Sequence, residues 1–295
     1  MAAQIISGKD IAKQIKEELK QEVAELKAKH NVVPGLATVL VGDDPASQVY
    51  VGSKEKTCQE MGIYSERYDL PSSTDEPTLL ALIDRLNKDP KINGILVQLP
   101  LPKHIDENNV LLAIDPKKDV DGFHPVNVGK IMIGDPDFLP CTPHGIQELL
   151  IRSGTEINGA EVVVVGRSNI VGKPIANILL QKGKGANATV TICHTGTRDM
   201  AAHTKRADII IAAIGRPKAI TADMVKDGVV VIDVGVNEIG KTEEGKRILC
   251  GDVDYEAIKE KAKAITPVPG GVGPMTIVML MGNAVKSAKI AAGLV

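Results

Sequence analysis

Residues 162–174, VVVVGRSNIVGKP, carry the clearest indication of the fold in this sequence. Its four consecutive valines form a short, β-branched apolar run, which predicts a buried strand. Gly166 and Gly172 flank the turn that follows, and Pro174 suits the first turn of a helix. A buried strand that leads through a glycine turn into a helix is typical of a parallel sheet covered by helices.

Further apolar strands follow this turn, and helix-compatible stretches separate them. We predict strands at 188–193, 208–215, 229–235 and, finally, 264–266. This alternation is typical of a doubly wound, Rossmann-type parallel sheet that binds a nucleotide. The fold class is therefore α/β, and we place this second domain at residues 140–274.

The first part of the chain alternates in the same way, which predicts another α/β domain over residues 1–120. We expect helices at 9–30 and 46–61 and around Leu79–Leu86, and strands at 36–42, 63–70 and 94–100. The segment 100–143 is rich in proline and suits a crossover between the domains. We expect the long apolar helix at 275–292 to pack back on the first domain.

Composition excludes several classes of protein. The 295 residues include no Trp, four Tyr and two Phe, too few aromatic rings for a platform that stacks nucleic-acid bases. The 35 basic and 37 acidic residues leave a formal net charge of −2, which does not attract DNA or an anionic membrane. No apolar run approaches the roughly 18 residues that a membrane span needs, and charge appears among the first few residues, so we expect neither a membrane span nor a secretory leader. We therefore expect a cytoplasmic protein that acts on a small molecule.

The cysteines indicate neither disulfides nor a metal site. Cys58, Cys141, Cys193 and Cys250 are widely separated and form no CxxC pair. His144 follows Cys141 at a spacing that occurs in zinc sites, but without a second pair we interpret it as incidental. We predict four reduced thiols and no bound metal.

The turn after 162–166 is a candidate cofactor loop, although it matches neither G-x-G-x-x-G nor a Walker A loop. A tight structural turn is the alternative to a pyrophosphate site at the following helix N-terminus. The next strand ends in Cys193–Arg198 with no acid before Asp199, whereas NAD-preferring sites usually place a carboxylate there. With Arg167 and Thr195 available for a 2′-phosphate, we favour NADP over NAD. Arg198 is as compatible with a solvated cation as with a phosphate contact.

Four polar residues of the first domain can perform acid–base chemistry. Tyr50 and Lys54 lie four residues apart on a predicted helix and so share a face. Gln98 stands at the carboxyl end of a strand, where open parallel sheets bind ligands, and Asp121 follows in a glycine-containing loop. From spacing alone, Lys54 could instead be a surface cation paired with Asp121 or Glu55.

Over essentially its whole length, the chain resembles the bifunctional methylenetetrahydrofolate dehydrogenase/methenyltetrahydrofolate cyclohydrolase family. The motifs that carry this resemblance are SQVYVGSK (47–54), VQLPLP (97–102), KDVDG (118–122), PCTPHG (140–145), VGRSNIVGKP (165–174) and PVPGGVGPMT (267–276).

The resemblance implies two sequential reactions in a cleft shared by the two domains. A hydride leaves 5,10-methylenetetrahydrofolate for NADP, and water then converts the 5,10-methenyl product to 10-formyltetrahydrofolate. Lys54 matches the family's catalytic lysine. Gln98 is implied to hold that lysine, Tyr50 to stack on the folate, and Asp121 to hydrogen-bond the pterin ring.

The resemblance also implies cofactor contacts. Gly166, Arg167 and Ser168 are implied to contact NADP, Thr195 to lie near the ribose phosphate, and Val236 to border the cofactor. Family members often have Ser at the position of Thr195 and Ile at that of Val236; both replacements are mild, but the first weakens the argument for NADP.

A last group of implied contacts lies in the glycine-rich loop. Pro269, Gly270 and Gly271 resemble the loop that lines the cleft beside folate, and capping of the last strand is an alternative role for them. The resemblance also implies a homodimer. Two rival hypotheses remain, a dehydrogenase without cyclohydrolase activity and a non-catalytic nucleotide-sensing protein on the same fold.

Overall fold

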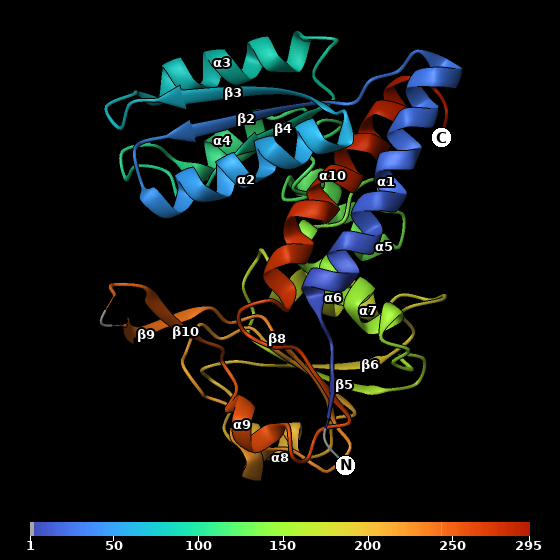
Figure 1. The fold of residues 1–295 in the computed structure, drawn as a ribbon, viewed down its shortest axis with the longest axis vertical. Coiled ribbons are helices and arrows are strands. Elements are labelled where there is room, and N and C mark those ends of the chain that lie inside the picture. Colours follow the sequence, from blue (N-terminus) through green and yellow to red (C-terminus); the bar gives the residue numbers. More distant parts are fainter. Residues whose placement is uncertain (1–2, 243) are drawn as a thin grey trace. The chain divides into compact units, whose positions relative to one another are not determined.

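A computed structural model describes residues 3–242 and 244–295. The chain forms two compact units, each built from separate parts of the sequence (Figure 1). The six-stranded unit contains the described part of Met1–Ala12 together with Thr142–Thr276, and the three-stranded unit contains Lys13–Cys141 and Ile277–Val295.

The six-stranded unit is built on a parallel sheet in the order β1-β11-β8-β7-β5-β6. Its strands are β5 (Glu161–Val165), β6 (Thr189–Cys193), β7 (Ile209–Ala212), β8 (Val230–Asp233), β11 (Ala264–Ile265) and β1 (Gln4–Ile5). The predicted Rossmann-type sheet is confirmed, because β5 lies between β6 and β7 and the chain changes direction across the sheet at that point.

The helices of this unit follow the predicted alternation. They are α6 (Cys141–Arg152), α7 (Gly172–Leu179), α8 (Met200–Thr204), the short 3-10 helix η1 (Ala222–Met224) and α9 (Tyr255–Ile258). One buried cluster joins alternate residues of the strands, such as Val163 and Ile210, to Ile258 of α9. The central strands are buried on both faces, which is why they read as continuous apolar runs.

Two features of the unit were not predicted. β1 pairs in parallel with β11 and brings the chain start into the sheet, but a two-residue strand is too short to show periodicity. An antiparallel hairpin, β9 (Asn237–Lys241) and β10 (Arg247–Cys250), forms a separate two-stranded sheet. Its residues are mostly exposed, so no apolar run marks it.

The three-stranded unit has a parallel sheet in the order β3 (Tyr64–Leu70), β2 (Gly35–Val41), β4 (Gly94–Val97). Three helices cover it: α2 (Pro45–Met61), α3 (Glu76–Lys88) and α4 (Glu107–Ala113). The third strand was predicted to reach residue 100 but ends at Val97. The proline-rich segment 100–143 is also more structured than expected, because it contains α4 and α5 (Pro125–Ile133), each of which begins with a cap or proline at its N-terminus.

Two long helices, α1 (Gly8–His30) and α10 (Val272–Ala291), contribute residues to both units. α10 begins at Val272 rather than at Met275, since Pro274 falls in its first turn, where proline is tolerated. Within the three-stranded unit, Asn283 Nδ2 donates to Val120 O at 2.7 Å and Leu139 O at 2.9 Å. Among the described residues, no helix combines the length and apolar character of a membrane span.

Candidate functional site

The α2 helix positions two of the predicted site residues. It begins directly after the carboxyl end of β2, where Asp44 Oδ2 accepts a hydrogen bond from Ser47 N at 2.8 Å and caps the helix. Tyr50 and Lys54 follow on consecutive turns. Tyr50 is half exposed, so its ring is open to a ligand, whereas only 8% of Lys54 is exposed.

An amide group holds the buried lysine. Lys54 Nζ donates to Gln98 Oε1 at 2.9 Å, and Gln98 Nε2 donates to Leu99 O at 2.7 Å. Because the amide nitrogen is engaged with a carbonyl, the amide oxygen faces the lysine. Gln98 follows β4, and its backbone N–H donates to Val39 O of β2 at 2.8 Å, so the sheet fixes its position. The alternative that Lys54 is a surface cation is wrong, since its side chain is buried.

Burial shifts the acid–base properties of both charged groups at this site. Desolvation lowers the pKa of Lys54, against the opposing effect of the nearby Asp121 charge. Desolvation also raises the pKa of Asp121 to about 6, against the opposing effect of the Lys54 charge. Cys141 Sγ lies 3.6 Å from Asp121 Oδ1, and burial raises the pKa of this thiol. The thiol therefore stays protonated and can donate to the carboxylate.

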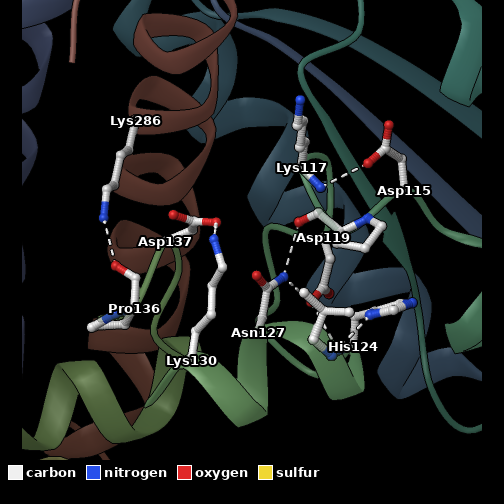
Figure 2. Close-up of polar contacts among 11 residues, drawn as sticks. Asp115, Lys117, Asp119, His124, Asn127, Lys130, Pro136, Asp137 and Lys286 are labelled. Atoms are coloured by element: carbon white, nitrogen blue, oxygen red, sulfur yellow. Dashed lines mark hydrogen bonds and ion pairs between the residues drawn. The ribbon is translucent and has the colours of Figure 1, made fainter. Parts of the chain in front are cut away.

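A second aspartate shapes the loop that carries Asp121. Figure 2 shows Asp119 beside His124 and Asn127: its Oδ2 accepts hydrogen bonds from His124 N and Asn127 Nδ2, both at 2.8 Å. Phe123 N donates to its Oδ1 at 3.3 Å. Sequence reasoning missed this residue, although two acids in KDVDG were a signal that one of them could support the other.

Two glycines shape the predicted cofactor turn between β5 and α7. Gly166 has φ +132°, and a Cβ built on it would lie 2.1 Å from Ala213 O at the end of β7. A Cβ on Gly172 would lie 2.3 Å from Gly166 O. Ser168 Oγ accepts from Val171 N at 3.1 Å and from Gly172 N at 3.3 Å, which closes the turn. The close backbone packing fits a turn that receives a dinucleotide.

Arg167 and His194 place two donors at the ends of β5 and β6. Gly196 N donates to His194 Nδ1 at 3.0 Å, so the neutral ring carries its proton on Nε2. Arg167 Nη1 lies 3.5 Å from that Nε2. Arg167 Nη1 and His194 Nε2 are then both hydrogen-bond donors and cannot bond to each other, but both can donate to one anion. Thr195 lies exposed in the same turn, which fits the predicted 2′-phosphate site.

The first acid after β6 is already engaged. Asp199 Oδ1 accepts from Ala202 N at 3.0 Å and caps α8, so it has a structural role at the helix start. Arg198 beside it is exposed. This arrangement supports the interpretation that the carboxylate of an NAD-type ribose site is missing from this turn.

The remaining predicted residues lie elsewhere in the six-stranded unit. Val236 follows β8 and is exposed. The loop that holds Pro269, Gly270 and Gly271 packs on the start of α1, where a Cβ on Gly8 would lie 1.7 Å from Gly271 O. The alternative structural role of this loop is therefore present.

The architecture and the two sets of polar residues define the class of protein: a two-unit α/β protein with a Rossmann-type nucleotide-binding sheet. Family comparisons agree with this class. Residues 6–121 match the catalytic domain of tetrahydrofolate dehydrogenase/cyclohydrolase, and residues 140–292 match the NAD(P)-binding domain of the same family. The chain belongs to the tetrahydrofolate dehydrogenase/cyclohydrolase family.

Individual relatives resemble the chain over its full length. "Bifunctional protein FolD" of Syntrophus aciditrophicus is 69% identical, with 100% of both chains covered. The bifunctional FolD crystal structure from Campylobacter jejuni is 50% identical with a TM-score of 0.91, covering 98% of this chain and 99% of that one. The Trypanosoma brucei enzyme, complexed with NADP cofactor and inhibitor, is 39% identical with a TM-score of 0.92, covering 98% of each chain.

Proposed function

We propose that this protein oxidises 5,10-methylenetetrahydrofolate with NADP and then hydrolyses the 5,10-methenyl product to 10-formyltetrahydrofolate, as part of one-carbon folate metabolism. The observation that carries the proposal is the buried Lys54, held by Gln98 and close to Asp121. Family membership and the "bifunctional" relatives support the same pair of reactions.

Lys54 moves the protons of the hydrolytic step. Water that attacks the methenyl carbon must lose a proton, and a folate nitrogen must gain one when the ring opens. A lysine whose pKa is lowered by burial can do both, because its neutral form is more accessible than that of a solvated lysine. Gln98 Oε1 keeps the Nζ atom in one position and so fixes where the proton is exchanged.

Tyr50 and Asp121 hold the folate. The half-exposed Tyr50 ring stacks on its flat ring system. Asp121 accepts hydrogen bonds from the N–H groups of the pterin, and an approaching polar ligand compensates for the desolvation of its carboxylate. Pro269, Gly270 and Gly271 contribute backbone contacts to the same substrate.

The turn after β5 binds the cofactor, which accepts the hydride of the oxidative step. Gly166 and Ser168 bring backbone close to the pyrophosphate, while Val236 borders the cofactor from the end of β8. Arg167, Thr195 and the His194 Nε2–H donate to the 2′-phosphate. Three donors without a neighbouring carboxylate favour NADP over NAD.

The two rival hypotheses do not explain why Lys54 is buried and held by Gln98. Neither a dehydrogenase without hydrolytic activity nor a nucleotide sensor needs a buried lysine held by an amide, and burying its charge is costly. On family membership we further propose a cytoplasmic homodimer, which light scattering after gel filtration tests. A monomeric mass at micromolar concentration would contradict the dimer.

One assay tests both activities. Purified protein with methylenetetrahydrofolate and NADP is followed at the absorbance bands of NADPH and of the methenyl intermediate, and hydrolysis is also started from methenyltetrahydrofolate. We expect Lys54→Met to lose about 100-fold or more in hydrolysis while retaining measurable hydride transfer. Lys261→Met is the control, since Lys261 is tied to the carbonyls of Ala222 and Val225 in the other unit. Equal loss of both activities in Lys54→Met would refute the proton-transfer role.

A further inference from the structure

A buried carboxylate joins two loops at the carboxyl edge of the six-stranded sheet. Asp252 is fully buried. Its Oδ2 accepts hydrogen bonds from Ile214 N at 2.6 Å and Gly215 N at 2.8 Å, and its Oδ1 accepts from Arg216 N at 3.0 Å and Asn237 Nδ2 at 2.9 Å. Four donors from two loops therefore converge on one side chain.

The first of these loops lies where the sheet binds its ligand. β5 and β7 are adjacent strands, and the connections that leave them run to opposite sides of the sheet, which makes their carboxyl ends the switch point of the fold. The loop after β7 begins with Ala213, whose carbonyl oxygen abuts Gly166 of the cofactor turn. Asp252 holds the next three residues of that loop through their backbone N–H groups.

The second loop carries Val236, which borders the proposed cofactor site. Asn237 follows immediately, and its side-chain amide donates to Asp252. The packing around this carboxylate leaves no room for a side chain at Gly235, since a Cβ there would lie 2.1 Å from Asp252 Oδ1. The backbone N–H of Asp252 itself donates to Asp233 Oδ1 at 2.9 Å at the end of β8. The loops after β7 and β8 are therefore both hydrogen-bonded to the carboxylate of Asp252.

We propose that Asp252 is a positioning residue for the NADP site: it fixes the loops after β7 and β8 in the conformation that receives the cofactor. The inference rests on the proposed function and adds a residue that contacts the cofactor only through these loops. A carboxylate suits this role, because each of its oxygens can accept two hydrogen bonds at once. An asparagine would direct its NH₂ group at two of the four donors.

The test is Asp252→Asn in the full chain, with NADPH binding measured by its fluorescence and both reactions measured by steady-state kinetics. Two loop donors lose their acceptor, so we expect NADPH affinity to fall and the KM for NADP to rise by about tenfold or more. Hydrolysis of methenyltetrahydrofolate, which needs no NADP, should stay within about twofold of wild type. A structural role alone would not separate these two activities.

Asn237→Ala and Thr204→Val distinguish a loss of loop positioning from a general loss of stability. Asn237→Ala removes one donor and leaves the carboxylate in place, so it should raise the KM for NADP by about threefold even if Asp252→Asn fails to fold. Thr204→Val removes a buried hydroxyl that bonds Met200 O within α8, away from both loops, and should lower stability without changing NADPH affinity. Unchanged NADPH affinity in Asp252→Asn and Asn237→Ala, or an equal loss in Thr204→Val, would overturn the proposal. If wild type itself does not reduce NADP, the proposed function fails instead.

Discussion

The proposed preference for NADP rests on individual side chains at the ends of β5 and β6. Arg167 Nη1 lies 3.5 Å from His194 Nε2, while Asp199 is engaged at the start of α8. A dianionic phosphate satisfies this arrangement better than a ribose hydroxyl does, because charge-assisted hydrogen bonds are the stronger ones.

Arg167→Gln should therefore impair NADP use selectively. We expect kcat/KM with NADP to fall about tenfold to 100-fold, since one charged hydrogen bond to the phosphate is lost, while kcat/KM with NAD changes little. Steady-state kinetics with both cofactors measure the ratio. Arg198→Gln is the matched control, because Arg198 is exposed in the same region. If Arg198→Gln instead produces the selective loss, Arg198 is the phosphate ligand.

A buried carboxyl makes stability depend on pH. Burial raises the pKa of Asp233 from 3.8 to about 6, so between these two values the folded protein binds a proton that the unfolded chain does not. The free energy of unfolding should therefore fall as pH rises through this window, by on the order of 2–3 kcal/mol from this residue. Asp121 contributes with the same sign.

Urea unfolding followed by far-UV circular dichroism at several pH values measures this slope. In Asp233→Asn the decrease between about pH 4 and 6 should become distinctly shallower than in wild type. An identical slope in the two proteins would mean that Asp233 is ionised throughout the window.

Among the elements, α2 determines where Lys54, the proposed proton-transfer residue, lies. The helix begins at Pro45, directly after its capping residue Asp44. Tyr50 and Lys54 both lie on α2. Fraying of its first turns would therefore move these two side chains as well as lower stability.

Removal of the α2 cap should affect stability and hydrolysis together. Asp44→Ala loses the hydrogen bond to Ser47 N and should destabilise the protein by about 1 kcal/mol. Asp75→Ala loses the equivalent cap of α3, which carries none of the site residues, and should cost about the same. Only Asp44→Ala should lower the rate of methenyltetrahydrofolate hydrolysis. Equal rates in the two variants would show that the start of α2 does not position Lys54.

The elements that the sequence predicts best are those with a strong local signal. The strands from β5 to β8 and the helices α1, α2 and α3 are apolar or periodic over several residues, so their approximate positions were predicted correctly. β1, β9 and β10 were missed, because two of them are mostly exposed and the third is two residues long. β1 also depends on β11, a partner strand far away along the chain, and no local pattern reports such a partner.

At the scale of the whole molecule, α10 completes a unit whose other residues come from the first half of the chain. Asn283 satisfies the buried carbonyl group of Val120 and the partly buried carbonyl group of Leu139. Ser287, one turn further on, hydrogen-bonds Asn93 O at 2.6 Å. Val120 directly precedes Asp121, so a residue of the last helix supports the loop of the proposed folate site.

Asn283→Ala should therefore lower stability and also disturb the Asp121 loop, although Asn283 is far from that loop in the sequence. The carbonyls of Val120 and Leu139 lose their donor, and we expect a loss of about 2–4 kcal/mol in the free energy of unfolding, together with a higher KM for folate in the hydrolytic reaction. Ser287→Ala removes the hydroxyl that hydrogen-bonds Asn93 O and Lys117 O one turn further along the same helix, and should lower stability without changing that KM. Urea unfolding and kinetics at saturating and limiting folate check both expectations. An unchanged KM for folate in Asn283→Ala would show that α10 does not support the proposed folate site.

The α/β class, the alternation of strands and helices, and the family all follow from the amino-acid sequence, because apolar periodicity and contiguous motifs are local properties of the chain. The sequence also identified Tyr50, Lys54, Gln98 and Asp121 as candidates, but spacing could not distinguish a surface lysine from a catalytic one. The folded chain is needed to show that Lys54 is buried against Gln98, that Asp119 and Asn283 support the Asp121 loop, and that Asp252 joins two loops. Burial and convergent hydrogen bonds arise between residues far apart in sequence, so they exist only once the chain has folded.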